Sequence, residues 1–448
     1  MKVFITGGTG FIGRHLVRRM AQTEHTIRCL ARKTSDTKEL RNLGAEIIVG
    51  DVNDRNSLKE GMQGCDWVFN LANVYSWWEP DKTVYRKINV EGTHNVMVCA
   101  LEAGVSKVVH VSTIGVWGKP EESPIREETP LAPERESEYC RTKLSGEQIA
   151  WQLYREKGLP LVVIYPCGVM GSGDPKLTGA TIKLLIERRL PATVFDDTIT
   201  TFVHVKDVAE AILKAAEKPD NLGEKYIVGN TRLSMEDYYD LISDVSGIAP
   251  PMFRMPDFLV MFNARLLTWL ADIIKRPPLW GMATDAMRTT KHGFIADGSK
   301  AERELGFVYT PIREAVEEEV AWYRQAVPGR IQQPVMEKEA DIPLYWSNEE
   351  RRSQERSRVN FPCDVEGLSR GKQIQQIAQV MNLSRDGMYL AAGTPLDEGT
   401  EVKAKITATS FNKTFWVMGK VLNSTAKGMA VRFADLVPKE IEMITHPQ

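Results

Sequence analysis

The sequence predicts an α/β protein: a doubly wound parallel sheet with a smaller substrate lobe, followed by a separate small antiparallel β-barrel. In the first 165 residues, short β-branched runs alternate with longer segments of helical spacing, which is typical of a parallel sheet with right-handed crossovers. After residue 346, strand-like runs follow one another with hardly any helical signal, which favours an antiparallel barrel. A chain of 448 residues has room for two or three such domains.

The elements of the first half follow in a regular order. Its buried strands are expected in the runs KVFIT, TIRCLA, EIIVG, WVFNLA, KVVHVS and LVVIYP. Between these runs, helical spacing is found in Gly13–Gln22, Ser57–Met62, Asn89–Ala103 and Tyr139–Lys157. From about residue 166 to 326 the chain is richer in loops and helices, and Pro311–Ala326 is predicted to be a closing helix. We expect one domain over residues 1–326, with its sheet core in about the first 165.

A linker is expected at 327–346, where three prolines and three acids occur without periodicity. The remaining residues, 347–448, carry six strand-like runs separated by turn residues: RVNFPCDV, KQIQQIAQVMN, GMYLAA, EVKAKITAT, FWVMGKVLN and GMAVRFA. The two halves belong to different fold classes, so the chain is interpreted as a fusion.

Composition excludes several kinds of protein. A formal net charge of −2 provides no broad basic surface for a nucleic acid polymer. The six cysteines have no C-x-x-C pair and no metal-ligand spacing, which favours a reducing compartment and no metal site. The N-terminus has no basic leader with an apolar core, and no run can span a bilayer, so a cytoplasmic protein is expected.

A glycine-rich turn follows the first strand. In TGGTGFIG, Gly7 permits the tight turn, Gly10 lets the backbone approach a pyrophosphate, and Gly13 lets the next helix pack against the strand. The helix N-terminus then offers free N–H groups to the anion. The order of strand, glycine triplet and helix predicts a Rossmann-type dinucleotide site, which includes the intervening residues Thr9, Phe11 and Ile12.

The next strand ends in Ala31, followed by Arg32 and Lys33. NAD-binding proteins place an acid here for the ribose 2′-hydroxyl, whereas an arginine can hold a 2′-phosphate. We therefore expect NADP(H) in preference to NAD(H); the alternative is that Arg32 stacks on the adenine of either cofactor. Further cofactor contacts are expected from the ends of the third and fourth strands, at Asp51, Val52, Leu71 and Ala72.

The catalytic candidates begin with Tyr139 and Lys143, a Tyr-x-x-x-Lys pair that shares one helix face. An ammonium near a phenol favours the phenolate, which would let Tyr139 exchange a proton with a substrate oxygen. Ser112 and Thr113 end the fifth strand at the carboxyl edge, where such sheets bind ligands. Asn89 is the fourth catalytic candidate.

In order along the chain, TGGTGFIG, GDV, NVEGT, STIGVWG, YCRTK, YPCGVMG and FVHVKDVA resemble the extended short-chain dehydrogenase/reductases, the NAD-dependent epimerase/dehydratase superfamily. The resemblance covers about residues 1–325 and implies that Thr113, Tyr139 and Lys143 form the catalytic triad with Asn89 in support. In the YPCGVMG motif it places Pro166 and Val169 beside the cofactor. ARKTSD and DGSKAERELGF are more similar to the dihydroflavonol-reductase and 3β-hydroxysteroid-dehydrogenase branch than to sugar epimerases. The sequence departs from the family pattern at Asn70, Asn73 and Tyr165.

Two segments bear on the substrate. Val74–Trp78 could line an apolar pocket or pack as a loop. Phe258–Ile274 could lie on a membrane or cover a lipophilic substrate, although a core or dimer helix is favoured. A homodimer is expected.

In the C-terminal half, ERRSQERSR contains an Arg-x-x-x-Arg pattern, and NLSRDG follows about 25 residues later. Together they resemble the PilZ domain, a small β-barrel that binds cyclic di-GMP. Arginines can hold phosphates and pair with guanine edges. The resemblance implies a cyclic di-GMP site at Arg352, Arg356, Asn382, Ser384 and Gly387, with Arg351 as an auxiliary.

The sequence therefore predicts an oxidoreductase that acts on a secondary alcohol or ketone under cyclic di-GMP control. Two alternatives stay open. One is a nucleotide-sugar epimerase or dehydratase under the same control, and the other is a non-catalytic, cofactor-sensing scaffold with a signalling barrel.

Overall fold

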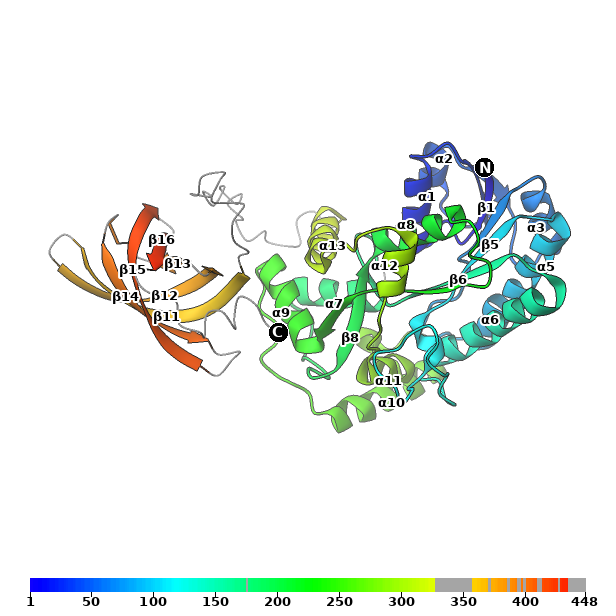
Figure 1. The fold of residues 1–448 in the computed structure, drawn as a ribbon. Helices are drawn as coiled ribbons and strands as arrows, with labels where there is room; N and C mark the ends of the chain where they lie inside the picture. The colour runs from blue at the N-terminus through cyan, green and yellow to red at the C-terminus, as the bar shows by residue number, and fades with distance from the viewer. Residues whose placement is uncertain are drawn as a thin grey trace. The chain divides into compact units, whose positions relative to one another are not determined.

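A computed structural model describes residues 1–174 and 176–326 and, in the C-terminal half, 357–369, 372–384, 387–392, 396–397, 400–408, 413–425 and 428–433. The chain divides into two compact units, Met1–Pro334 and Val335–Gln448 (Figure 1). The linker expected at 327–346 lies outside the described residues.

The first unit is built on a seven-stranded parallel sheet with the order β3-β2-β1-β4-β5-β6-β9. Its strands are β1 Lys2–Thr6, β2 Thr26–Ala31, β3 Glu46–Val49, β4 Trp67–Asn70, β5 Lys107–Val111, β6 Leu161–Pro166 and β9 Lys225–Val228. The strand order reverses between β1 and β4, and ligands of such sheets bind at this switch point beyond the carboxyl ends of the strands. The predicted doubly wound sheet is confirmed.

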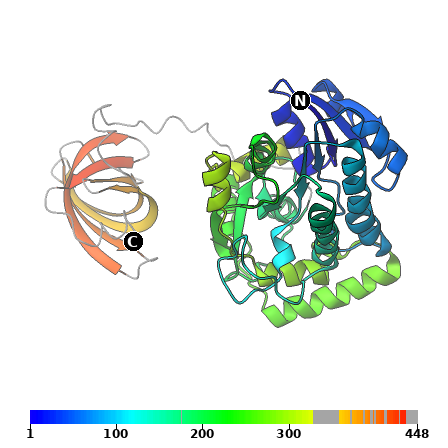
Figure 2. The same ribbon diagram turned by 45° about the vertical axis from the view of Figure 1, so that its right-hand side comes forward.

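Helices cover both faces of this sheet because alternate strand residues point to opposite sides. In β1, Val3 and Ile5 join the core under helices α1 and α8, whereas Phe4 joins the core under α3, α5 and α6 (Figure 2). The bounds of these helices are α1 Phe11–Met20, α3 Arg55–Met62, α5 Thr93–Ala103, α6 Glu138–Lys157 and α8 Val205–Glu217. A short helix, α2 (Lys38–Asn42), precedes β3.

A smaller lobe contains a three-stranded sheet, β10-β8-β7, that the sequence patterns did not predict. Its strands are β7 Gly168–Met170, β8 Ile199–His204 and β10 Thr231–Ser234. Around them lie α7 Leu177–Ile186, α9 Met235–Ser246, α10 Asp257–Ile274, α11 Thr284–His292, α12 Ser299–Leu305 and α13 Ile312–Ala326. The predicted closing helix is confirmed as α13.

Four short helical segments lie near the carboxyl edge of the sheet or in the lobe. The short helix α4 (Thr83–Tyr85) continues into a π-helical turn, Arg86–Gly92, and a 3-10 turn, Ile114–Trp117, follows β5. A second 3-10 turn, Leu279–Gly281, precedes α11. π-helical turns inside helices are frequent at functional sites. In the described ranges no helix is long and apolar enough to cross a membrane.

The second unit is a closed barrel in the order β11-β12-β13-β16-β15-β14, with antiparallel neighbours. The strands are β11 Ser357–Ser369, β12 Lys372–Ser384, β13 Gly387–Ala392, β14 Glu401–Ala408, β15 Lys413–Thr425 and β16 Gly428–Phe433. Alternate residues of β14, Val402, Ala404 and Ile406, are buried in the barrel core. Six predicted strands and the predicted barrel are therefore confirmed.

Candidate active site at the carboxyl edge of the sheet

The glycine-rich turn is packed too closely for side chains. Gly7 has φ +74°, and a Cβ there would lie 2.7 Å from the backbone N of Ala72. A Cβ on Gly13 would lie only 2.1 Å from the carbonyl O of Gly7. The turn itself is closed by the Gly10 N–H, which donates to the Gly7 carbonyl at 3.0 Å. Gly13 therefore lets α1 approach the strand, and the free N–H groups of α1 open toward the switch point.

A buried polar network fixes this edge of the sheet. The Thr6 hydroxyl donates to Asn70 Oδ1 at 2.7 Å and accepts from the Ala72 N–H at 3.2 Å. The Asn70 amide lies 3.1 Å from His110 Nδ1. Asn70, one of the departures from the family pattern, thus ties β1, β4 and β5 together. Asn73 donates to the Leu71 carbonyl at 2.9 Å, while its buried Oδ1 has no partner in the described residues and is free to meet a ligand.

Arg32 and Lys33 directly follow β2 and are exposed. Within the described part of the chain, neither side chain forms a hydrogen bond or ion pair. Asp51 follows β3, and its carboxylate accepts from the backbone and side-chain N–H groups of Asn53, both at 3.0 Å. The adjacent Val52 is buried against Gly92. The end of β2 therefore carries two free cations, and the end of β3 carries an oriented carboxylate.

The other predicted cofactor residues lie around the same edge. Thr9 accepts from the Arg14 guanidinium through its carbonyl at 3.0 Å, and Phe11 and Ile12 open α1. Pro166 is the last residue of β6, and Val169 lies in β7, half-buried against the core.

Tyr139 lies in the first turn of α6 and is buried between aromatic rings. Its ring centroid is 5.1 Å from that of Tyr75 and 5.8 Å from that of Trp77, both with edge-on geometry. Burial raises the pKa of its phenol, and the adjacent Cys140 acts in the same direction, whereas a hydrogen bond from Thr113 lowers it. The structure thus brings Tyr139 and Thr113 together. The pKa of the phenol lies above its ordinary value, which is contrary to the shift toward phenolate expected from the Lys143 ammonium.

One turn further along α6, Lys143 is 2% exposed. Its ammonium donates to the Val111 carbonyl at 2.7 Å, at the end of β5. Burial lowers the pKa of Lys143 to about 8, opposed by the nearby Glu147. The helix face expected from the Tyr-x-x-x-Lys spacing therefore meets the carboxyl edge of the sheet.

Glu147 is a site residue that the sequence reasoning missed. Its buried carboxylate accepts from the Ser112 hydroxyl at 2.5 Å, from the Tyr165 hydroxyl at 2.6 Å and from the Trp151 indole at 3.1 Å. Tyr165, another departure from the family pattern, is thus a partner of this carboxylate. The available signal was helical spacing, because Glu147 follows Lys143 by four residues on the same face.

Asn89 lies in the π-helical turn and is fully buried. Its Oδ1 accepts from the Val74 N–H at 2.8 Å, and its Nδ2 donates to the Thr142 hydroxyl at 3.0 Å. A Cβ on Gly146 would lie 2.1 Å from the Asn89 carbonyl, so α6 can approach this turn only because residue 146 is glycine. Asn89 therefore joins α6 to the loop after β4.

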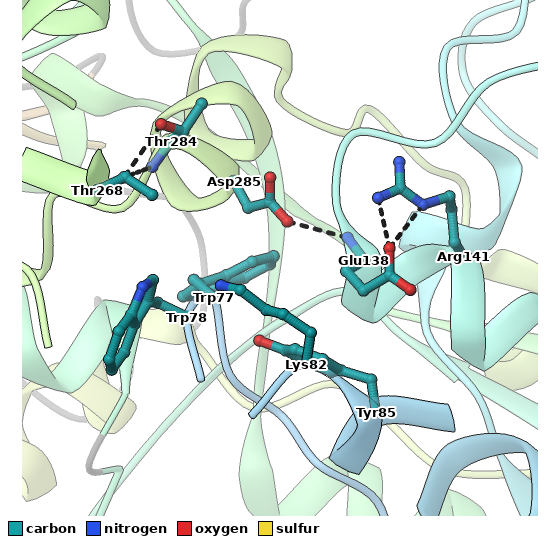
Figure 3. A pocket seen from close by; sticks show the side chains of 9 residues that line it. All are labelled: Trp77, Trp78, Lys82, Tyr85, Glu138, Arg141, Thr268, Thr284 and Asp285. Atoms are coloured by element: carbon teal, nitrogen blue, oxygen red, sulfur yellow. Dashed lines mark hydrogen bonds and ion pairs between the residues drawn. The ribbon is translucent and has the colours of Figure 1, made fainter. Parts of the chain in front are cut away.

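A pocket of about 230 Å³ opens at the start of α6, where Glu138 and Arg141 of that helix line it (Figure 3). Trp77, which contacts Tyr139, lies on its wall, and the Trp77 indole N–H is buried without a partner in the described residues. The Asp285 carboxylate accepts from the Glu138 N–H at 2.9 Å, at the first residue of α6. The pocket is lined by Trp77, Trp78, Lys82, Tyr85, Glu138, Arg141, Thr268, Thr284 and Asp285.

In the barrel, the described candidates lie around the β12–β13 hairpin. In the backbone register of the sheet, Asn382 lies opposite Arg358 of β11 and Tyr389 of β13. Ser384 lies opposite Gly387, at the end of the hairpin where β12 and β13 meet. Arg351, Arg352 and Arg356 lie outside the described residues.

A glycine turn at the switch point, with Tyr-x-x-x-Lys on the helix that crosses the same edge, is the arrangement of the extended short-chain dehydrogenase/reductase class. The family model "NAD dependent epimerase/dehydratase family" matches residues 3–229, and the model "PilZ domain" matches residues 350–446. The chain belongs to the NAD-dependent epimerase/dehydratase family and carries a C-terminal PilZ domain.

The chain is also similar to individual proteins over its first unit. A Synechocystis protein named for dihydroflavonol 4-reductase activity is 30% identical over 328 residues, which cover 72% of this chain and 94% of that protein. Sterol demethylase protein B of Methylococcus capsulatus is 30% identical and is covered over 99% of its length, by 72% of this chain. The crystal structure of gox2253 is 33% identical, with a TM-score of 0.63 over 74% of this chain and 99% of that one. The relatives include proteins named as reductases.

Proposed function

We propose that this protein is an NADP(H)-dependent reductase of a lipophilic ketone, or dehydrogenase of the corresponding secondary alcohol, and that cyclic di-GMP binds its PilZ domain. The observation that carries the reductase proposal is the buried Tyr139 phenol, hydrogen-bonded to Thr113, in contact with Trp77 of the pocket wall and one helical turn from Lys143. Replacement of Tyr139 tests it, as argued in the Discussion.

The residues at the switch point fit a dinucleotide. Gly7 and Gly13 let the turn pack closely against its own backbone and that of Leu71 and Ala72, and the unpartnered Asn73 Oδ1 faces no protein donor. Arg32 and Lys33 would hold the 2′-phosphate of NADP(H), since both are exposed and no acid in the described residues neutralises them. Asp51 would accept from the adenine amine, and Lys143 would hold the nicotinamide ribose.

The proton chemistry is assigned to the chain's own residues. When bound, reduced nicotinamide supplies hydride to the carbonyl carbon of the substrate. Thr113 would donate to the carbonyl oxygen and orient it, and Tyr139 would deliver the proton to that oxygen as the alcohol forms. The raised pKa of Tyr139 favours the protonated donor, which is the form that ketone reduction requires. Asn89 would act as a positioning residue, because it connects α6 to the loop that carries Trp77.

The rate of ketone reduction is expected to fall as pH rises above about 8. Below that pH, Lys143 carries its charge and stabilises the developing phenolate of Tyr139. Above it, the lysine loses the charge, and kcat/KM should decline toward about tenfold per pH unit. The measurement is a pH profile of NADPH oxidation at ketone concentrations well below KM, with cofactor affinity followed in parallel. A rate that rises through pH 8 would contradict the assigned protonation states.

The pocket fits a substrate that has an apolar body and polar substituents. Trp77, Trp78 and Tyr85 provide aromatic walls, and the charged lining residues are Lys82, Glu138, Arg141 and Asp285. Sterol demethylase protein B, a relative covered over nearly its full length, is named for a sterol. A panel of steroid and other lipophilic ketones therefore comes first. Purified protein that retains NAD(H) and interconverts nucleotide sugars without net redox change would favour the epimerase or dehydratase alternative instead.

Cyclic di-GMP is expected to bind the wild-type protein in isothermal titration calorimetry, and Arg356→Ala should remove the measured heat. Paired arginines can hold phosphate and guanine together, so one lost guanidinium should weaken binding by about 100-fold or more. Lys372→Ala, at the start of β12, is a control that should bind normally. Absence of heat with the wild type would refute the ligand assignment.

A further inference from the structure

Helix α10 presents apolar side chains to solvent. In most surface helices the apolar stripe faces the core and the exposed stripe is polar. On α10 the exposed stripe consists of Phe258 at 74% exposed, Phe262 at 61%, Leu266 at 44%, Trp269 at 59% and Ile273 at 59%. We call this set, together with the flanking Leu270 and Ile274, the α10 face.

The opposite side of α10 packs through small residues, so the large side chains cannot turn inward. Ala264 and Ala271 are buried against α11, together with Val260. The Thr268 hydroxyl donates to the Ala264 carbonyl at 2.7 Å and accepts from the Thr284 N–H at 2.9 Å. These contacts fix the rotation of the helix. The outward position of the α10 face is therefore a consequence of packing on the other side.

The apolar surface continues beyond the helix. After Lys275 and Arg276 the chain turns, and Leu279 and Trp280 are 62% and 51% exposed. The α10 helix runs along the outer edge of its unit in both views, as the yellow-green helix at the lower edge in Figure 2. Exposed patches of this extent mark binding surfaces for proteins or membranes.

The charges near the α10 face help to decide whether a protein or a membrane covers it. The acids of α10 are both engaged: Asp257 pairs with Lys291 at 3.1 Å, and Asp272 accepts from the Trp78 indole at 2.8 Å and lies 3.6 Å from Lys82. Across the described ranges, the exposed cations Arg265, Lys275 and Arg276 have no acidic partner. The free charges along the α10 face are thus all positive.

We propose that the α10 face rests on a membrane surface that contains anionic lipid. Interfacial helices combine a wide apolar face with lysine, arginine and tryptophan at the headgroup level, and this face provides all three. A second copy fits less well. In a two-fold pairing about the midpoint of α10, Arg265 would face its own counterpart without a free acid to neutralise it. Thr268 of the same helix lines the pocket at the start of α6, so a lipophilic substrate held in the membrane would lie close to the pocket; this extension rests on the proposed function.

The test is vesicle co-sedimentation of the full chain, without cofactor or substrate. Vesicles of phosphatidylcholine alone are compared with vesicles that also contain phosphatidylglycerol. Wild-type protein should bind the anionic vesicles, and Phe262→Asp combined with Trp269→Asp should reduce binding at least about tenfold. Leu222→Asp combined with Val308→Asp replaces two exposed apolar residues elsewhere in the unit and should bind like the wild type. Lys275→Glu with Arg276→Glu should weaken binding to the anionic vesicles selectively.

The outcomes separate cleanly. The proposal would be overturned if the wild type bound neither vesicle, or if the Phe262 and Trp269 variant bound as well as the wild type. If the wild type bound neutral and anionic vesicles equally, the assignment of anionic lipid would be overturned. A wild-type dimer that this variant converts to a monomer, without vesicle binding, would assign the face to a second copy. The measurement requires no enzymatic turnover, so it stands apart from any failure of the reductase assignment.

Discussion

Tyr139→Phe is expected to lower kcat/KM for ketone reduction by about 10²- to 10⁴-fold, the usual contribution of a positioned proton donor. The variant keeps the ring that packs against Tyr75 and Trp77, so the pocket should keep its shape. It loses only the hydroxyl that hydrogen-bonds Thr113 and would deliver the proton. The measurement is NADPH oxidation with the most rapidly reduced ketone of a panel, together with an NADPH titration.

Tyr75→Phe is the matched control. Tyr75 lies 5.1 Å from Tyr139 between ring centroids and is 38% exposed, and its hydroxyl has no assigned role in proton transfer. Its loss should change kcat/KM little. If Tyr139→Phe retains near wild-type turnover while NADPH binding is intact, Tyr139 is not the proton donor. If NADPH binding is lost as well, the variant has altered the cofactor site and the rate says nothing specific about proton transfer.

Local signals account for the parts of the site that could be predicted from sequence. The glycine turn follows from chain geometry within eight residues, and the Tyr139–Lys143 pair follows from helical spacing. The parallel sheet follows from the alternation of strands and helices. Each of these depends on neighbours in sequence, and the structure places them together at one edge of the sheet.

The Glu147 network depends on the crossing of α6 over β5 and β6, which no spacing in one segment reveals. For the same reason, the sequence shows Asn70 and Tyr165 only as departures from a family pattern. In the structure, Asn70 is hydrogen-bonded to Thr6, and Tyr165 is hydrogen-bonded to Glu147. The small β10-β8-β7 sheet joins short segments that are far apart in the chain, and its strands are too short to show a clear period.

The sequence predicts the environment of helix α10 only in part, and the reason is different. An apolar run predicts burial but does not say what buries it, so the favoured interpretation of Phe258–Ile274 was a core or dimer helix. The structure corrects the core interpretation, because only Val260, Ala264 and Ala271 of this helix are buried. In most surface helices the large apolar residues face the core, whereas α10 buries small residues and exposes large ones. This arrangement can be recognised only when the packing partner, α11, is known.

The cofactor site offers a second large effect at Gly13. Gly13→Ala places a Cβ 2.1 Å from the Gly7 carbonyl and 2.8 Å from Gly8 Cα. Both neighbours are backbone atoms in a closed turn, so the strain cannot be relieved by rotating a side chain. Overpacking of this kind costs about 1–3 kcal/mol or more. We expect a lower melting temperature and, because the turn itself is displaced, NADPH binding weakened by about 100-fold or more.

Gly10→Ala separates the two effects. Its Cβ would lie 3.2 Å from the Gly7 carbonyl, at a backbone φ of −78° that any residue can adopt. The fold should tolerate this methyl group, yet it would stand where the backbone must approach a pyrophosphate. We therefore expect a nearly unchanged melting temperature with weaker NADPH binding, measured by thermal unfolding and fluorescence titration on the same samples. Full NADPH affinity in Gly10→Ala would show that the cofactor does not bind in this turn. If both variants lose NADPH affinity and only Gly13→Ala is destabilised, Gly10 serves the ligand and Gly13 serves helix packing.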